Sequence, residues 1–135
     1  HAGCVIGMNG TAGSLFEHTL RGENGYFSHI VTQMQYSAVA GACMMVKKDI
    51  FEKVNGFDED YKGELGKVDL CLKIRNKHMS VVYNPYVKVM RWSNELRNNE
   101  NDEKLFKKQW AEILEKDDPY YNKNLSLSVS GCNIR

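Results

Sequence analysis

The sequence predicts an α/β fold in which a mixed sheet is flanked by helices. Short apolar runs, typical of buried strands, alternate along the chain with segments of helical periodicity. Turn signals such as Asn55-Gly56 and Asn84-Pro85 separate these segments. With 135 residues, of which 42% are hydrophobic, the chain is long enough to build one core. Only three or four strands are expected, a thin sheet that a missing partner would complete better.

The first expected strand covers residues 3–8 and leads into a glycine-rich loop. Gly7, Gly10 and Gly13 give this loop its backbone freedom. Its sequence, GMNGTAG, superficially resembles a phosphate-binding loop, but the Gly-Lys-Ser/Thr ending is missing. We therefore favour an ordinary loop over a phosphate cradle. Residues 14–35 are weakly patterned and predict loop and short helix.

A small-residue segment begins at Tyr36 and ends in a second buried strand, residues 43–46. Its small side chains would let the backbone approach another part of the molecule closely: Ala38, Ala40, Gly41 and Ala42. An amphipathic helix is expected over residues 47–54, with its apolar side chains inward: Ile50, Phe51 and Val54. Gly56 ends this helix, because glycine accepts the left-handed conformation.

The second half of the chain predicts two further helices around a pair of strands. The helix at residues 68–76 is apolar on two sides, which indicates that it is well buried. Strands at residues 80–83 and 87–90 flank the Asn84-Pro85 turn. The third helix, residues 103–115, places four apolar side chains on one face: Phe106, Trp110, Ile113 and Leu114.

Charge and cysteine usage exclude several functional classes. The formal net charge is +1, and no basic block is long enough to argue for nucleic-acid binding. No apolar run approaches the roughly 18 residues of a membrane helix. The four cysteines form no Cys-x-x-Cys pair, so zinc and thioredoxin-type chemistry have no support. We expect a cytoplasmic protein, with any contact to the inner face of a membrane made through parts missing from this chain.

Six motifs occur in order over nearly the whole chain, and together they carry a resemblance. They are His1-Ala2-Gly3, Ser37 to Lys48, Phe51-Glu-Lys-Val-Asn-Gly-Phe-Asp-Glu59, Val68-Asp-Leu-Cys-Leu-Lys-Ile-Arg75, Val82-Tyr-Asn-Pro-Tyr86 and Asp118-Pro-Tyr-Tyr-Asn-Lys-Asn-Leu-Ser126. In this order they resemble the C-terminal half of family 2 glycosyltransferases, particularly bacterial enzymes that build surface polysaccharides. The third motif carries the most weight, because the family writes Phe-x-x-Val-Gly-Gly-Phe-Asp-Glu there.

The resemblance implies that the chain is the C-terminal half of a Rossmann-like sandwich. It further implies inverting transfer of a sugar from a nucleotide-diphosphate donor to a saccharide or other hydroxyl acceptor. A divalent metal, Mg²⁺ or Mn²⁺, is implied at the diphosphate. The family's nucleotide-binding strands and Asp-x-Asp metal motif lie in the N-terminal half, so we expect no metal ligand in this chain and no activity from it alone.

We expect two parts in the chain. Residues 1–116 would form the acceptor-side half of the domain, and residues 117–135 a polar tail that Tyr120 and Tyr121 can dock.

The string Asp58-Glu-Asp60 is spelled like the metal motif, but it stands in the acceptor half. A solvated acidic loop is the favoured interpretation there.

Departures from the family pattern are as informative as the matches. Where the family carries its catalytic base this chain has Lys67, a cation at neutral pH that cannot simply replace a carboxylate. Where the family has a metal-binding histidine the chain has Arg91, which coordinates no divalent cation. The family's threonine before Gly-Ala is Ala40. His78 replaces a glycine after a helix, so we expect it in the left-handed conformation.

Two carboxylates are candidate catalytic bases. Glu64 stands in a glycine-flanked loop from which it could reach into a cleft; otherwise it is a plain surface carboxylate. Asp69 is the acid that the motif retains. Its alternative role is that of a helix N-terminal residue that accepts backbone N–H bonds.

The candidates for substrate binding are Gly41, Ala42, Lys67, Arg91 and Trp92. Lys67 and Arg91 could neutralise a leaving diphosphate without a metal. Trp92 offers a flat face that either stacks on a pyranose ring or anchors a strand end.

Two classes of function stay open. The first is a working glycosyltransferase of which this chain is the acceptor half. The second is a non-catalytic relative, a sugar- or partner-binding module that kept the fold and lost the base and the metal ligand. An unrelated hydrolase is much less favoured, since no Ser-His-Asp or Cys-His pairing is visible. The sequence identifies neither the donor sugar, the acceptor nor the oligomeric state.

Overall fold

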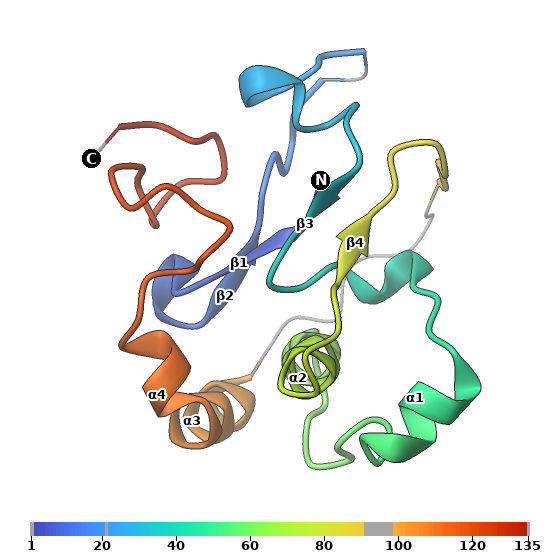
Figure 1. Cartoon of the computed structure of the whole chain (residues 1–135). Helices are drawn as coiled ribbons and strands as arrows, with labels where there is room; N and C mark the ends of the chain where they lie inside the picture. Colours follow the sequence, from blue (N-terminus) through green and yellow to red (C-terminus); the bar gives the residue numbers. More distant parts are fainter. Residues whose placement is uncertain (1, 21, 91–98, 135) are drawn as a thin grey trace.

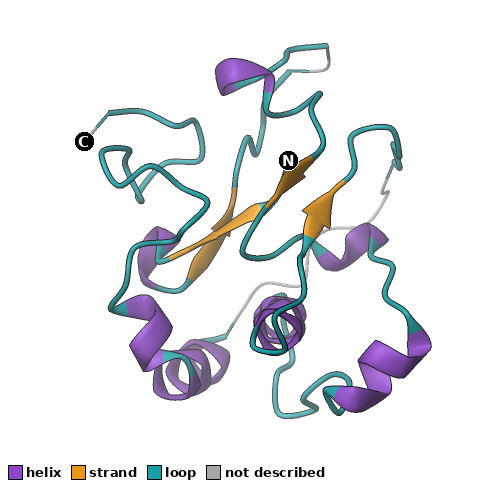
Figure 2. Cartoon of the chain, viewed as in Figure 1, coloured by secondary structure: helices purple, strands orange, loops and turns teal. Residues whose placement is uncertain are grey.

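The computed structural model describes residues 2–20, 22–90 and 99–134. Short strands lie in the middle of the molecule, and the α-helices gather on one side of them (Figures 1 and 2). The strands are β1 (Cys4–Ile6), β2 (Ala12–Ser14), β3 (Met34–Gln35) and β4 (Val82–Tyr83). The α-helices of the described residues are α1 (Lys48–Lys53), α2 (Leu65–Arg75), α3 (Glu100–Gln109) and α4 (Ala111–Leu114). Single 3-10 turns are η1 (Met8–Gly10), η2 (Tyr26–Ser28) and η3 (Gly41–Cys43).

The strands form two separate antiparallel pairs. In the first pair β1 runs beside β2, with Cys4 opposite Ser14. In the second pair β3 runs beside β4, with Met34 opposite Tyr83. The Cys4 amide donates to the Ala38 carbonyl at 2.8 Å, an isolated bridge that links β1 to the segment that follows β3. The expected first strand is confirmed, and the whole is a small α/β fold; its place in a larger Rossmann-like sandwich stays a prediction.

Two expected strands are wrong. Residues 43–46 begin within η3 and then run as extended chain without a strand partner among the described residues, and Met45 is 97% exposed. Residues 87–90 likewise form no strand, and Val87, Val89 and Met90 are exposed. Met44 and Val46 still pack against the main core. An apolar run becomes a strand only when a neighbouring strand pairs with it, and the described residues supply no such neighbour for either run.

The first two predicted helices are confirmed, with shifted ends. Helix α1 matches the expected amphipathic helix, and the Gly56 amide donates to the Phe51 carbonyl at 2.8 Å with Gly56 at φ 59°. Helix α2 begins at Leu65, three residues before the expected start. His78, two residues past its C-cap, has the expected left-handed backbone at φ 58°.

The expected third helix is two helices, α3 and α4. Helix α3 begins earlier than expected because the Asn99 side chain accepts the Asp102 amide at 2.8 Å, an ordinary N-cap. The break falls at Trp110, whose φ of −115° is not helical. Phe106 and Trp110 are buried as predicted, whereas Ile113 is only partly buried.

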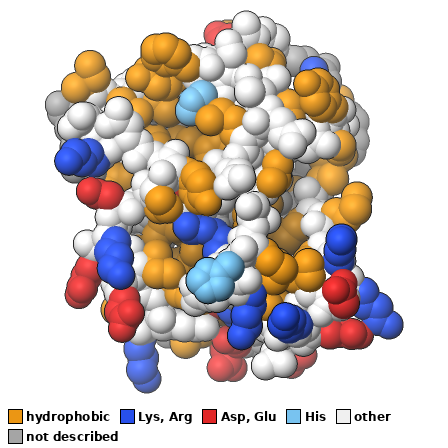
Figure 3. Space-filling model, viewed as in Figure 1, with side chains coloured by type: hydrophobic (Ala, Val, Ile, Leu, Met, Phe, Trp, Pro, Cys, Tyr) orange, Lys and Arg blue, Asp and Glu red, His pale blue; other side chains and the backbone are white. Residues whose placement is uncertain are grey.

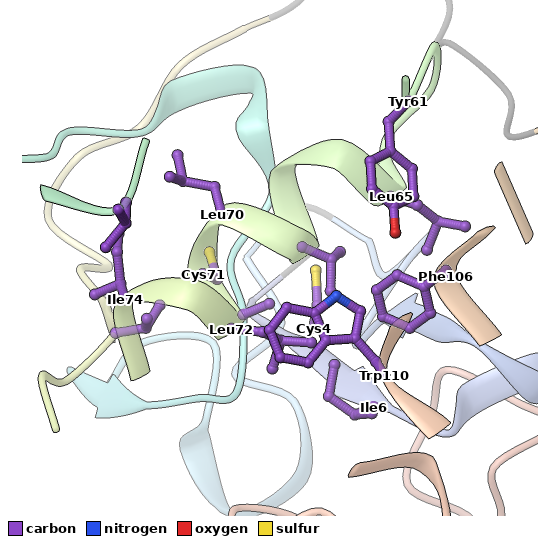
Figure 4. Packing of buried hydrophobic residues seen from close by; sticks show 14 residues of the cluster. Cys4, Ile6, Tyr61, Leu65, Leu70, Cys71, Leu72, Ile74, Phe106 and Trp110 are labelled. Carbon is purple, nitrogen blue, oxygen red and sulfur yellow. The ribbon is translucent and has the colours of Figure 1, made fainter. Parts of the chain in front are cut away.

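The main core surrounds α2, which is buried on both sides as its pattern predicts. This helix contributes more side chains to the cluster than any other element: Leu65, Val68, Leu70, Cys71, Leu72 and Ile74. Figure 4 shows Phe106 of α3 and Trp110, just after that helix, near the labelled side chains of α2, with Cys4 and Ile6 of β1 beside them. Each fully buried leucine of this kind contributes about 1.5–3 kcal/mol relative to an exposed one.

A second core holds the C-terminal segment in place. Leu125 and Cys132 are buried in one cluster with Val5, Leu15 and Tyr36. Backbone bonds reinforce the contact, as the Phe16 amide donates to the Ser130 carbonyl at 2.8 Å. The segment expected as a polar tail therefore completes the fold through apolar contacts.

The surface in the view of Figure 3 carries both signs of charge. Lysine, arginine and acidic side chains are interspersed over the helical side, while hydrophobic atoms are more frequent over the strands and loops. This face therefore creates no broad field of one sign, as expected for a net charge of +1. Within the described ranges, no helix has both the length and the apolar content to cross a membrane.

Candidate functional site

A cleft of about 330 Å³ opens between the β1–β2 hairpin, the 39–41 segment and the first turn of α2. Three of the predicted site residues line it together: Gly41, Glu64 and Lys67. Glu64 is the N-cap of α2, and Lys67 lies one turn along the same helix. The two side chains are therefore on neighbouring positions of one helix face.

Lys67 and Glu64 form an ion pair inside this cleft. The Lys67 Nζ donates to Glu64 Oε1 at 2.9 Å. The side chains are 25% and 27% exposed, respectively, so solvent reaches both groups. A pair this accessible adds little to stability, about 0–1 kcal/mol, and its value lies in fixing the position of the two charges.

Gly41 is glycine because the Lys67 side chain occupies the space that a Cβ would need. A Cβ built on Gly41 would lie 2.4 Å from Lys67 Cγ and 2.5 Å from Cδ. The sequence predicted that the small residues of this segment allow a close approach, and at Gly41 this is confirmed. The approaching group is the aliphatic stem of Lys67.

A buried carboxylate fixes the loop that presents Glu64. Asp102 of α3 is 1% exposed and accepts the Gly63 amide at 2.7 Å and the Lys62 amide at 3.1 Å. Gly63, the residue before Glu64, is thus bonded to α3 rather than to the helix that Glu64 caps. Sequence reasoning missed Asp102, because nothing local links it to a loop 39 positions earlier.

Asp69, the second candidate base, lies outside the cleft lining. It is 0% exposed, within α2 rather than at its N-terminus, so the helix N-terminal interpretation is wrong. Its Oδ1 accepts hydrogen bonds from the side-chain amide of Gln109 at 2.9 Å and from the indole N–H of Trp110 at 3.1 Å. Lys73 Nζ lies 3.1 Å from Oδ2, an ion pair without the alignment of a good hydrogen bond. Burial raises the pKa of Asp69, while Lys73 and Trp110 oppose this shift.

Of the remaining predicted site residues, only Ala42 is described by the structure. Ala42 is exposed beside Gly41 and is not part of the lining. Arg91 and Trp92 lie outside the described residues. The predicted contact of Arg91 with a diphosphate and that of Trp92 with a sugar ring therefore stay predictions.

The glycine-rich hairpin lines the cleft without forming a phosphate cradle. Asn9, Gly13 and Ser14 belong to the lining. The loop amides are used within the protein: Gly7 donates to the Thr11 carbonyl at 2.8 Å and Gly10 to the Gly7 carbonyl at 3.0 Å. A phosphate cradle needs such N–H groups to point at the ligand, so the geometry agrees with the ordinary loop.

Carboxylates line the cleft without assembling a metal site. Glu17 and Glu103 join Glu64 in the lining, yet the described residues contain no group of three His, Cys, Asp or Glu that could hold a metal ion. In the acidic loop, the Asp58 carboxylate accepts the Asp60 amide at 3.0 Å. The described residues therefore do not fit the divalent metal that the resemblance implies for the complete enzyme, and we derive no step through a metal.

A third buried carboxylate, Asp118, connects the C-terminal segment to the strands. It accepts the Ile6 amide and the Ser37 hydroxyl, each at 2.8 Å, and the Tyr120 amide at 2.9 Å. Arg75 donates to the same Ser37 hydroxyl at 2.8 Å and lies over the Tyr120 ring. The start of the sixth sequence motif is thereby explained as a structural anchor.

The chain is similar in sequence to two bacterial proteins. It is 34% identical over 140 residues to the uncharacterized protein y4gI of Sinorhizobium fredii; the match covers 94% of this chain and 15% of that protein. It is 30% identical over 141 residues to the O-antigen biosynthesis protein RfbC of Myxococcus xanthus, covering the whole chain and 11% of that protein. The chain thus spans a small part of either relative. No family model matches it, and no solved structure does.

Proposed function

We propose that this chain supplies the acceptor side of a glycosyltransferase of surface-polysaccharide biosynthesis. The transferase would move a sugar from a nucleotide-diphosphate donor to a hydroxyl of a saccharide or other acceptor. The six ordered motifs support this proposal, and so does the similarity to a protein named for O-antigen biosynthesis. The observation that carries it is a carboxylate, Glu64, fixed at the edge of an open cleft.

Glu64 is the proposed catalytic base. An acceptor hydroxyl would enter the cleft and give its proton to the Glu64 carboxylate as its oxygen attacks the anomeric carbon of the donor. The bond from that carbon to the diphosphate breaks in the same step, and attack from the opposite face inverts the configuration. The donor would be bound by protein outside this chain. Asp69 is unsuited to this role, because its oxygens already face Trp110, Gln109 and Lys73.

The test is Glu64→Gln in the full-length protein that carries this chain. Sugar transfer would be followed as release of the nucleoside diphosphate in the presence of an acceptor. We expect kcat to fall by roughly a hundredfold or more, the contribution of a general base. Glu103→Gln is the matched control, since Glu103 also lines the cleft and also pairs with a lysine of its own helix, Lys107 at 3.9 Å, but stands at no position that the resemblance links to the base. If both variants lose activity equally, Glu64 is not the base.

The second candidate function is a non-catalytic saccharide-binding relative. It is favoured by one observation, the placement of Lys67 against Glu64, since a cation stands where the resemblance puts the base. Such a protein would bind saccharides, as measured by calorimetry, and show no transfer from any nucleotide-diphosphate sugar offered. Detectable turnover that depends on Glu64 would reject this alternative.

A further inference from the structure

Lys67 has two possible partners, and they imply different roles. The sequence suggested a diphosphate, whose charge a lysine could neutralise. In the structure its ammonium lies 2.9 Å from the Glu64 carboxylate, and its stem packs against Gly41. The cation is thus already neutralised by a carboxylate, which leaves less charge to attract a phosphate group.

The packing of the Lys67 stem against Gly41 restricts the conformation in which Lys67 pairs with Glu64. A lysine on a helix surface ordinarily samples many rotamers, and pairing it with a carboxylate costs that freedom. Here the Cγ and Cδ of Lys67 lie against the Gly41 backbone. They could not come so close if residue 41 carried a side chain. The stem is therefore directed along the cleft wall toward Glu64, whose own loop is fixed by the Gly63 amide on Asp102.

We propose that Lys67 is a positioning residue that holds the Glu64 carboxylate in the cleft, and that Gly41 makes this possible by admitting the Lys67 stem. This inference rests on the proposed function, because it assigns Glu64 the role of base. A carboxylate has two oxygens, so one that is held by an ammonium leaves the other to accept a proton. A base displaced by about 1 Å can lose roughly a hundredfold in rate, which gives such positioning its value.

The test is a double-mutant cycle on Glu64 and Lys67 in the full-length protein. Lys67→Met should lower kcat by roughly tenfold to a hundredfold and leave the donor KM within about twofold. Lys67→Arg should restore part of kcat, because a guanidinium at the same position can still pair with Glu64. In the Glu64→Gln background Lys67→Met should have no further effect, since the residue to be positioned is gone.

Gly41→Ala provides a second route that leaves every charge in place. Gly41 is not in the left-handed region, so alanine fits the backbone, but its Cβ would displace the Lys67 stem. We expect kcat to fall as in Lys67→Met, with the donor KM unchanged. Circular dichroism and thermal melting of both variants check that the fold is retained.

The outcomes separate this inference from the proposed function. If Lys67→Met raises the donor KM severalfold and still does so in the Glu64→Gln background, Lys67 is a diphosphate ligand and the inference is wrong. If Glu64→Gln abolishes turnover while the folded Lys67→Met and Gly41→Ala variants keep it, the inference alone fails. If Glu64→Gln leaves turnover within about twofold, or the wild-type protein transfers no sugar, both fail together.

Discussion

The indole N–H of Trp110 donates to the buried carboxylate of Asp69 at 3.1 Å, which ties the middle of α2 to the break between α3 and α4. Gln109 donates to the same oxygen and accepts the Tyr61 hydroxyl at 3.0 Å, so the loop before α2 joins the network. On this evidence the acid retained in the fourth motif stabilises the junction of three segments. That role explains its presence without any contact to substrate.

Removing the Asp69 carboxylate should destabilise the protein strongly. Asp69→Ala leaves the Trp110 and Gln109 donors and the Lys73 ammonium without their buried acceptor. Breaking a buried charged network in this way costs about 3–5 kcal/mol. Chemical denaturation should show this loss in the free energy of unfolding, whereas the exposed control Asp60→Ala should change it by less than about 0.5 kcal/mol. Equal effects of the two substitutions would contradict the assignment.

The same carboxyl gives a pH dependence of known sign. Because burial raises the pKa of Asp69 in the folded protein, the folded state holds its proton more tightly than the unfolded chain. Stability from this group is therefore complete below the unfolded pKa, about 3.9, and is lost as the pH rises through the folded value. Asp69→Asn, which mimics the neutral acid, should gain stability relative to wild type as the pH rises from 3 to 7. Unfolding free energies of both proteins across this range provide the measurement, and a difference independent of pH would show that the shift is absent.

The parts of the fold that could be predicted are those with a local signal. Helix α2 has apolar residues on both sides, and Phe106 and Trp110 recur one turn apart, so periodicity alone indicated their burial. The left-handed residue His78 followed from its place after a helix. In each case the information lies within a few residues of the feature.

The parts that could not be predicted depend on distant partners. Ile6 and Asp118 are 112 positions apart, and no local pattern reveals that one will bond to the other. The run at residues 43–46 has the composition of a buried strand, but pairing is a property of a neighbour and cannot be seen in the run itself. In the site, Glu64 and Lys67 share a helix, yet the cleft beside them needs Gly41 and the β1–β2 hairpin to exist.

The chain alone should bind nucleotide-diphosphate sugars weakly or not at all. The resemblance assigns the nucleotide pocket to protein outside this chain, and no cradle of loop amides is available at the glycine-rich hairpin, where Gly7 and Gly10 donate to their own loop. Calorimetry with uridine- and deoxythymidine-diphosphate sugars should therefore give no heat at micromolar concentrations. Micromolar binding would show that the chain contains a donor site of its own. The proposal that protein outside this chain binds the donor would then be wrong.

Asp118 should control how firmly the C-terminal segment is attached. Its carboxylate accepts hydrogen bonds from the Ile6 amide of β1 and from the Ser37 hydroxyl. Removing the carboxylate therefore leaves two buried donors unsatisfied. Each such group costs about 1–3 kcal/mol. Asp118→Ala should thus release the segment that carries Leu125, which would then be cleaved by a protease under conditions in which the wild-type chain is resistant.

The neighbouring Asp117→Ala is the matched control, because Asp117 is exposed and differs from Asp118 by one position. Limited proteolysis followed by mass spectrometry should place the new cleavage sites of Asp118→Ala after residue 118, with those of Asp117→Ala unchanged from wild type. Hydrogen exchange should agree, with faster exchange at the Phe16 amide, which donates to the Ser130 carbonyl at 2.8 Å only while the segment stays docked. If Asp118→Ala keeps the wild-type cleavage pattern and exchange rate, the apolar contacts of Leu125 and Cys132 suffice to hold the segment, and the carboxylate is not its anchor.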